Sequence, residues 1–230
     1  MNQTCYMCER PATSDEHVPP KCLFPEEKDL PKGVSLRKDL IKVPACDNHN
    51  TARSKDDEYL LYVLSMNIAN NAVAFRQFST KVLRAVGRRP GLMQSMLSER
   101  QEVVAVDRAG AAHNALMVEV DMSRIHKCLN QISRALYYKE FQRKFGGTCR
   151  FLHDFTIADD SKFTLKVKDD ESEKSALEYV KPYFRQYDHK GSNPSVFRYR
   201  FEDSDERGLV ALSMQFYGGS NAFVAFVPSA

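Results

Sequence analysis

The sequence contains no run of about 18 apolar residues, the length that a membrane-spanning helix requires. The first ten residues have neither the basic stretch nor the apolar stretch with which a secretory signal begins. Internal repeats and low-complexity tracts are also lacking. We therefore expect a globular protein of the cytoplasm that has no membrane partner.

Cysteine is too scarce for a disulfide-stabilised scaffold, with six residues in a chain of 230. In a reducing compartment, clustered cysteines bind metal more often than they pair with one another. Hydrophobic residues make up 43% of the chain and charged residues 27%, which is ordinary for a globular protein and sufficient for a core. The length suits one large domain or a small domain plus a medium one.

The net charge of +3 conceals an uneven distribution. Residues 1–60 contain 9 Lys and Arg against 11 Asp and Glu, residues 61–150 contain 14 against 6, and residues 151–230 contain 10 against 13. The middle third therefore carries the excess positive charge. Such a region is typical of proteins that bind a polyanion, and solvated helix faces explain it equally well.

Hydrophobic periodicity predicts an α+β fold with an antiparallel sheet. A helix is expected to begin near Asp47 and to continue past Tyr62. A long amphipathic helix is expected to follow Ser123, which is its candidate N-cap. The other expected helices are 74–86 and 175–187, and the expected strands are two segments joined near 109–110, then 150–157, 196–201, 209–218 and 221–228. We predict an N-terminal module (1–62), a helical connector (63–100) and a C-terminal α+β domain (101–230).

Two pairs of metal-competent side chains lie in the first 50 residues: Cys5-x2-Cys8 and Cys46-x2-His49. If the second pair occupies one helical turn, its two side chains share a face and can reach one ion. Three cysteines and one histidine form a common structural zinc set. Cys22 is an alternative fourth ligand, and buried cysteines without metal are the other interpretation.

Such a metal would act as a scaffold, because this segment is poor in apolar side chains. Asn50 would lie about 100° further round the helix than His49. It could then face the strand that carries Glu16 and His17, so that a carboxylate, an imidazole and an amide oxygen converge beside the metal.

The stretches CYMCERPATSDEHVPPKCLFP and VPACDNHNTARSKDDEYL resemble the HNH endonuclease family, in its zinc-stabilised form with a ββα-metal, treble-clef core. The resemblance covers about residues 5–62. It consists of a CxxC pair, an acidic residue before histidine, V-x-P, and a Cys-x2-His pair followed by asparagine. It implies a hydrolase that cleaves phosphodiester bonds in DNA, by nicking or by double-strand cleavage.

The resemblance gives His17 the role of general base, and it gives Glu16 and Asn50 the role of ligands for a catalytic ion. A neutral imidazole can deprotonate water, and a hard cation such as Mg²⁺ or Mn²⁺ takes oxygen ligands. Asp39 is the nearest counterpart of the middle asparagine of the family, at a spacing about two residues longer. Zn²⁺ would be structural.

Several basic residues are candidate phosphate contacts, which position nucleic acid without reading its sequence. The alternative interpretation is that these basic residues lie on helix faces exposed to solvent. The first set is Arg53, Lys55, Arg84, Arg88 and Arg89, and the second is Arg134, Lys139, Arg143 and Lys144.

Two other functions are consistent with the same residues: a zinc-stabilised nucleic-acid-binding adaptor without catalysis, and an RNA-cleaving toxin. From the resemblance we expect a bacterial defence or mobile-element nuclease, with antiviral defence as its setting. A homodimer or a regulatory partner protein would be consistent with a nuclease that must be controlled.

Overall fold

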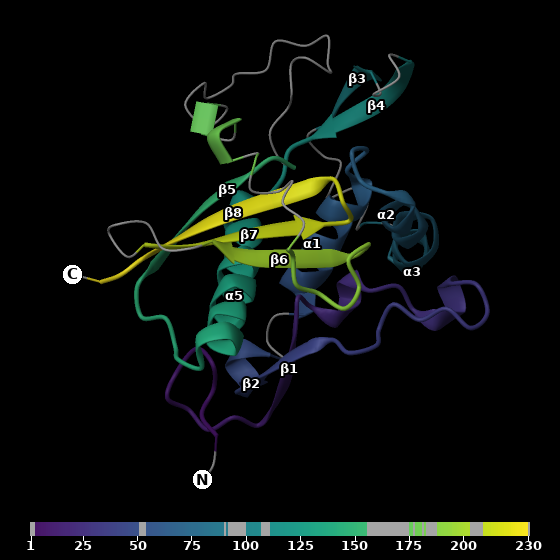
Figure 1. Cartoon of the computed structure of the whole chain (residues 1–230). Helices are drawn as coiled ribbons and strands as arrows, with labels where there is room; N and C mark the ends of the chain where they lie inside the picture. The colour runs from purple at the N-terminus through teal and green to yellow at the C-terminus, as the bar shows by residue number, and fades with distance from the viewer. Residues whose placement is uncertain are drawn as a thin grey trace.

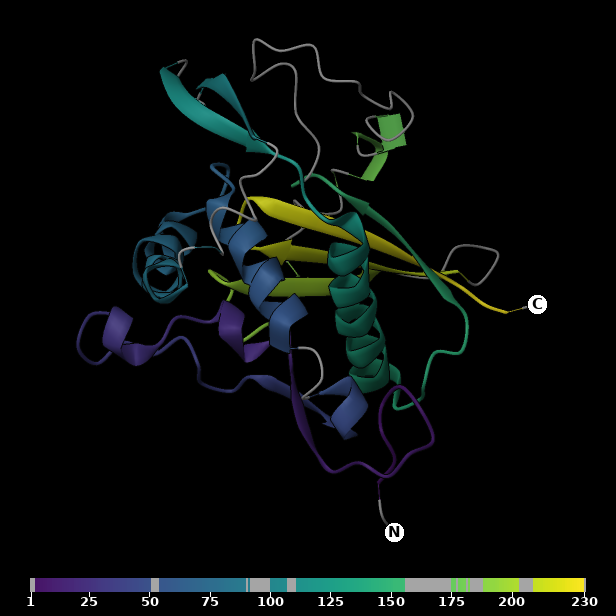
Figure 2. The same cartoon turned by 180° about the vertical axis from the view of Figure 1, so that it is seen from behind.

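A four-stranded antiparallel sheet with two helices on one face forms the centre of the computed structural model (Figures 1 and 2). The structure describes residues 3–50, 54–89, 91, 100–106, 111–155, 175–176, 178–180, 182, 188–202 and 209–229. The order in the sheet is β5 (Thr148–His153), β8 (Ser220–Val227), β7 (Val210–Phe216) and β6 (Phe197–Glu202). The predicted α+β class with an antiparallel sheet is confirmed.

Helices α1 (Ser54–Met66) and α5 (Met122–Phe141) lie side by side against this sheet (Figure 2). In β8 every second residue is buried, as expected for a strand with one face on a core. The N-cap of α5 is Asp121, whose carboxylate accepts hydrogen bonds from the backbone N–H of Ser123 and Arg124. Ser123 was the predicted cap, but the carboxylate two residues earlier takes that place.

The N-terminal hairpin consists of β1 (Ser14–Val18) and β2 (Ile41–Ala45), which pair antiparallel. The expectation of a helix from Asp47 is wrong. Residues Asp47–His49 form a short 3-10 turn, and α1 spans Ser54–Met66. Asn50 follows the turn with φ −123° and ψ −78°, outside the helical region, so the turn does not continue as a regular helix at this residue.

The predicted helix at 74–86 is present as three consecutive pieces: α2 (Ala72–Gln77), a π-helical segment (Phe78–Val82) and α3 (Leu83–Arg88). The predicted pair of strands after residue 100 is also present, as the hairpin of β3 (Arg100–Val106) and β4 (Ala112–Val118), which projects from the main sheet (Figure 1). Its turn lies outside the described residues, as does much of the predicted helix 175–187.

Buried residues of all three predicted segments belong to one hydrophobic cluster, with Val43 from the hairpin, Leu64 from α1 and Phe226 from β8 among them. Tyr217, at the turn after β7, donates its hydroxyl to the backbone oxygen of Leu23. The predicted domain boundaries stay a prediction, but the N-terminal segment packs directly on the C-terminal sheet. Within the described residues, no helix has the length and apolar character needed to cross a membrane.

Candidate metal centre and the adjoining basic hollow

The side chains of Cys5, Cys8, Cys46 and His49, here termed the Cys/His cluster, converge at one point. The Sγ atoms of Cys8 and Cys46 are 3.8 Å apart, and His49 Nδ1 lies 3.4, 3.6 and 3.4 Å from the Sγ atoms of Cys5, Cys8 and Cys46. Around one tetrahedral zinc, metal–sulfur bonds of about 2.3 Å and metal–nitrogen bonds of about 2.1 Å imply separations of about 3.8 and 3.6 Å. The cluster can therefore hold a metal ion.

Hydrogen bonds to backbone oxygens hold the cluster in this form. The amide of Tyr6 donates to the oxygen of Pro44, which fixes the CxxC turn to the end of β2. The amide of His49 donates to the oxygen of Cys46 at 2.9 Å and closes the 3-10 turn. Lys144, just beyond α5, donates to the oxygen of Cys8 at 2.7 Å. The C-terminal half of the chain thus contributes to the support of the metal centre.

Cys22, the alternative ligand, is not a member of the Cys/His cluster. Its thiol donates to the backbone oxygen of Asp57, and burial raises its pKa to about 12. His49 is therefore the fourth member of the cluster.

Glu16 and His17 point to opposite faces of β1, because neighbouring residues in a strand alternate. Glu16 pairs with Val43 on the face that packs on the core, and it is 5% exposed. His17 pairs with Lys42 on the other face and is half-buried. The imidazole therefore faces away from the core, towards a hollow in the surface.

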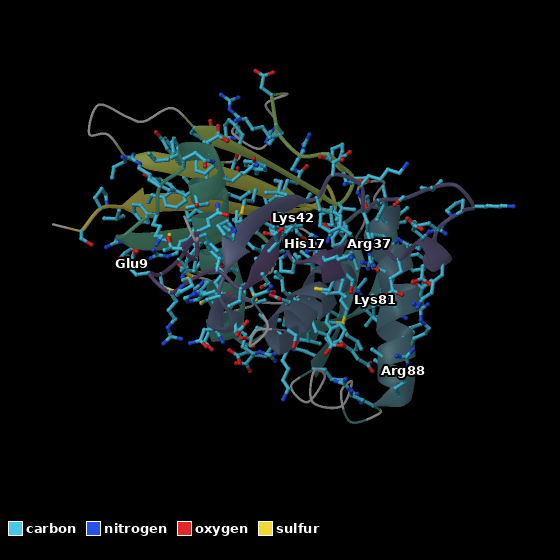
Figure 3. All side chains as sticks on the ribbon, turned by 90° about the horizontal axis from the view of Figure 1, so that it is seen from below. Glu9, His17, Arg37, Lys42, Lys81 and Arg88 are labelled. Carbon is cyan, nitrogen blue, oxygen red and sulfur yellow. The ribbon has the colours of Figure 1, made fainter. Side chains whose placement is uncertain are left out.

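This hollow has a volume of about 740 Å³ and is termed the basic hollow below. His17 and Lys42 come from the hairpin, and the other lining residues come from the segment that joins β1 to β2. Figure 3 shows His17, Lys42 and Arg37 together, with Lys81 next to them and Arg88 further along the helical segment. The lining residues are His17, Lys21, Glu27, Arg37, Asp39, Leu40 and Lys42.

The environment of His17 keeps its imidazole neutral. Burial lowers its pKa below the usual value of 6.5, and the charges of Lys42, Lys21 and Arg37 lower the pKa further, against a smaller opposing effect of Asp15. Desolvation and nearby cations both disfavour a protonated imidazole. A neutral imidazole beside positive charges can accept a proton from water next to a bound anion.

Arg37 is oriented by the backbone: its Nε and Nη2 both donate to the oxygen of Phe24, at 3.1 and 2.9 Å. Asp39 has a positive φ of 51°, and its backbone oxygen accepts a hydrogen bond from Ser192. The side-chain amide of Asn193 donates to the backbone oxygen of Lys38. The loop before β6 thus fixes one wall of the basic hollow from the C-terminal half.

Asn50 lies beside the first residues of β1. Its amide nitrogen donates to Ser14 Oγ at 2.7 Å and to the backbone oxygen of Asp15 at 3.4 Å. Ser14 and Glu16 share a strand face, so Asn50 lies towards the side of Glu16 rather than that of His17. Its amide oxygen, the atom that would bind a metal ion, takes part in neither of these two bonds. The convergence of Glu16, His17 and Asn50 on one catalytic ion stays a prediction.

The predicted phosphate contacts differ in their surroundings. Arg84 forms a two-point ion pair with Asp29, with both N–O distances 2.6 Å, and Arg89 lies 3.7 Å from a carboxylate oxygen of Glu58. Arg88 and Lys55 are exposed. Arg53 lies outside the described residues.

In the second predicted set, two side chains make contacts within the chain. Arg134 donates to the backbone oxygens of Phe145 and Gly147, and Lys144 pairs with Glu9 as well as with the oxygen of Cys8. Arg143 lies over the ring of Tyr137, and Lys139 lies in the last turn of α5. These contacts give Arg134 and Lys144 structural roles that do not require nucleic acid.

Replacing Arg84 by alanine is expected to reduce stability and to leave nucleic-acid affinity nearly unchanged. The guanidinium holds the pKa of Asp29 below its usual value through two hydrogen bonds, and the Asp29 side chain is only 5% exposed. Losing this pair costs about 1 kcal/mol, which lowers Tm by roughly 2–4 °C in a chain of this size. Thermal unfolding and a binding titration measure the two effects. Arg88→Ala, at an exposed position, is the control, and we expect it to weaken binding instead.

Sequence reasoning did not identify Lys21, Arg37 and Lys42 as members of the site. Lys42 was recognisable in principle, because it lies opposite His17 once the two strands are paired in register. Arg37 and Lys21 belong to the irregular segment between the strands, and periodicity carries no information there.

The chain matches no family model, no curated protein and no solved structure.

Proposed function

We propose that the protein is a metal-dependent endonuclease of the HNH type, which hydrolyses phosphodiester bonds of DNA. The observation that carries the proposal is the environment of His17: an imidazole with a lowered pKa in an open hollow. The other charged residues that line the hollow are three cations, Lys21, Arg37 and Lys42, and two carboxylates, Glu27 and Asp39. The hairpin that bears it is fastened at its other end by the Cys/His cluster. The motif resemblance over residues 5–62 supports the same function.

In this proposal the Cys/His cluster holds Zn²⁺ as a structural ion. Three thiolates and one imidazole fill a tetrahedral shell and leave no open position for substrate, which distinguishes structural from catalytic zinc. The ion fastens the CxxC turn to the turn after β2, and these two segments are 38 residues apart in sequence between Cys8 and Cys46. A segment with few apolar side chains is thereby held in one conformation.

The proposed proton transfer takes place on the face of the hairpin that bears His17. His17 accepts a proton from the attacking water, while Arg37, Lys42 and Lys21 neutralise charge on the phosphate. Glu16 and Asn50 offer carboxylate and amide oxygens, which suit a hard ion such as Mg²⁺ or Mn²⁺. Such an ion would stabilise the departing oxygen if it lay against the phosphate held beside His17, whereas Glu16 faces the other side of β1. Glu16 is 5% exposed, so an ion can reach its carboxylate only through a small opening. Dependence of cleavage on a divalent ion is therefore the first property to test.

The test incubates the purified protein with supercoiled plasmid, linear duplex DNA, single-stranded DNA and RNA, each with Mg²⁺, Mn²⁺ or EDTA. We expect plasmid cleavage with the divalent ions and none with EDTA. Cleavage of RNA alone would make the protein a ribonuclease. Binding without cleavage of any polymer under any condition would contradict the nuclease proposal and favour an adaptor.

The pH dependence of cleavage is expected to reflect the lowered pKa of His17. The base is active when neutral, so the rate rises with pH and approaches its plateau with a midpoint below 6.5, the ordinary pKa of histidine. Lys42→Gln removes a cation that lowers this pKa, and the midpoint is therefore expected to move to higher pH. Single-turnover rates at saturating protein measure the midpoint.

Lys38→Gln is the matched control, since Lys38 belongs to the same segment but its side chain does not line the basic hollow. We expect this variant to keep the wild-type midpoint. An unchanged midpoint in Lys42→Gln, with the fold intact, would show that His17 is not the titrating base.

A further inference from the structure

His126 on α5 and His153 on β5 bring two ring nitrogens together at a place remote in sequence from the Cys/His cluster. Their Nε2 atoms are 3.2 Å apart. Two nitrogens bound to one tetrahedral ion at about 2.0–2.1 Å are separated by about 3.3 Å. The observed separation therefore fits one shared transition-metal ion.

Aromatic neighbours fix the orientation of both rings. The ring of His126 stacks on Phe151, with centroids 5.6 Å apart and an interplanar angle of 25°. The ring of His153 contacts Phe155, with centroids 5.1 Å apart. Rings held in this way lose little conformational freedom when they bind an ion, and such pre-organisation favours binding.

The exposure of the pair also suits a metal ion. His153 is 7% exposed, whereas His126 lies at the surface. One side of the pair is buried and the other is open to water.

We propose that His126 and His153 form a second metal site, which takes a borderline divalent transition ion such as Ni²⁺, Cu²⁺ or Zn²⁺ through two imidazole nitrogens. Among the described residues, no third His, Cys, Asp or Glu joins the pair to form a larger cluster, so water completes the coordination. Nitrogen donors suit these three ions, whereas the thiolates of the Cys/His cluster favour zinc. The site joins α5 to the edge strand of the sheet and does not depend on nuclease activity.

The test uses Ni²⁺ as the probe and the full chain with zinc retained in the Cys/His cluster. Calorimetric titration and elemental analysis after dialysis count the nickel bound by the wild type, His126→Gln and His153→Gln. We expect the wild type to bind one more equivalent than either variant. Ni²⁺ is also expected to raise the Tm of the wild type and to leave the Tm of both variants unchanged.

His113→Gln, at an exposed histidine on β4, is the matched control and is expected to bind as the wild type does. His126 lies at the surface, so His126→Gln keeps the test informative even if His153→Gln folds poorly. Equal nickel binding by the wild type and His126→Gln would overturn the proposal. The two rings would then share only an imidazole–imidazole hydrogen bond.

Discussion

Replacing Cys46 by serine is expected to release the ion from the Cys/His cluster and to unfold the N-terminal hairpin. Cys46 is 4% exposed and lies between the end of β2 and the 3-10 turn that carries His49. Its Sγ is 3.8 Å from that of Cys8, which lies 38 residues earlier in the chain. Without the thiolate, tetrahedral coordination is incomplete and the free energy of metal binding no longer contributes to folding.

Loss of a structural metal belongs to the few single changes that cost more than about 4 kcal/mol, which lowers Tm by roughly 8–16 °C for a chain of this length. Elemental analysis gives the metal content, thermal unfolding gives Tm, and amide hydrogen exchange shows whether protection is lost over β1 and β2. Chelation of the metal in the wild type is expected to have the same effect as the substitution.

Cys149→Ser is the control, because Cys149 is a free, half-buried cysteine outside the cluster. Burial raises the pKa of its thiol to about 11, and Cys149 is not a member of the Cys/His cluster. This variant is expected to retain the metal. If Cys46→Ser retained the metal content and the Tm of the wild type, the metal would not be held by the Cys/His cluster, and a structural role of metal at this cluster would be excluded.

Replacing His17 by alanine is expected to reduce the cleavage rate by about 10²–10⁴-fold while the fold and the metal content are retained. His17 is half-buried on the open face of β1, so its loss creates no cavity in the core. The neighbouring Val18 is 3% exposed and keeps its packing. The change therefore removes the proposed base without removing what supports the hairpin.

Single-turnover cleavage of plasmid measures this effect, and a binding titration shows whether affinity is retained through Arg37 and Lys42. His113→Ala on β4 is the control, and its cleavage rate is expected to equal that of the wild type. Equal cleavage by His17→Ala and the wild type would refute the catalytic assignment. A loss of cleavage accompanied by a loss of metal would instead show that His17 acts on the structure.

The sequence motif and the structure place Glu16 differently relative to His17. In the motif, Glu16 and His17 are adjacent and read as one acidic–histidine unit. In the strand they alternate, so Glu16 packs beside Val43 and His17 faces Lys42. Strand pleating separates neighbours in the sequence and brings together residues from opposite strands.

The metal cluster was predictable from the sequence because ligand identity and spacing are local properties. Two pairs with a spacing of three residues suffice to place Cys5 with Cys8 and Cys46 with His49, whatever the conformation of the turn. The turn itself was predicted as the first turn of a helix and is a 3-10 turn. A 3-10 turn also brings residues i and i+3 to one side, so the ligand set was right although the element was wrong.

The sequence by itself determined the α+β class, the strand runs of the C-terminal sheet and the four members of the Cys/His cluster, since periodicity and spacing are recorded in short stretches of chain. Only the tertiary structure decided that Arg37 and Lys42 stand beside His17, that Arg84 pairs with Asp29, and that His126 meets His153. These contacts join residues through strand pairing, irregular loops and helix-on-sheet packing. No periodic pattern encodes such contacts, because they depend on how distant segments pack together.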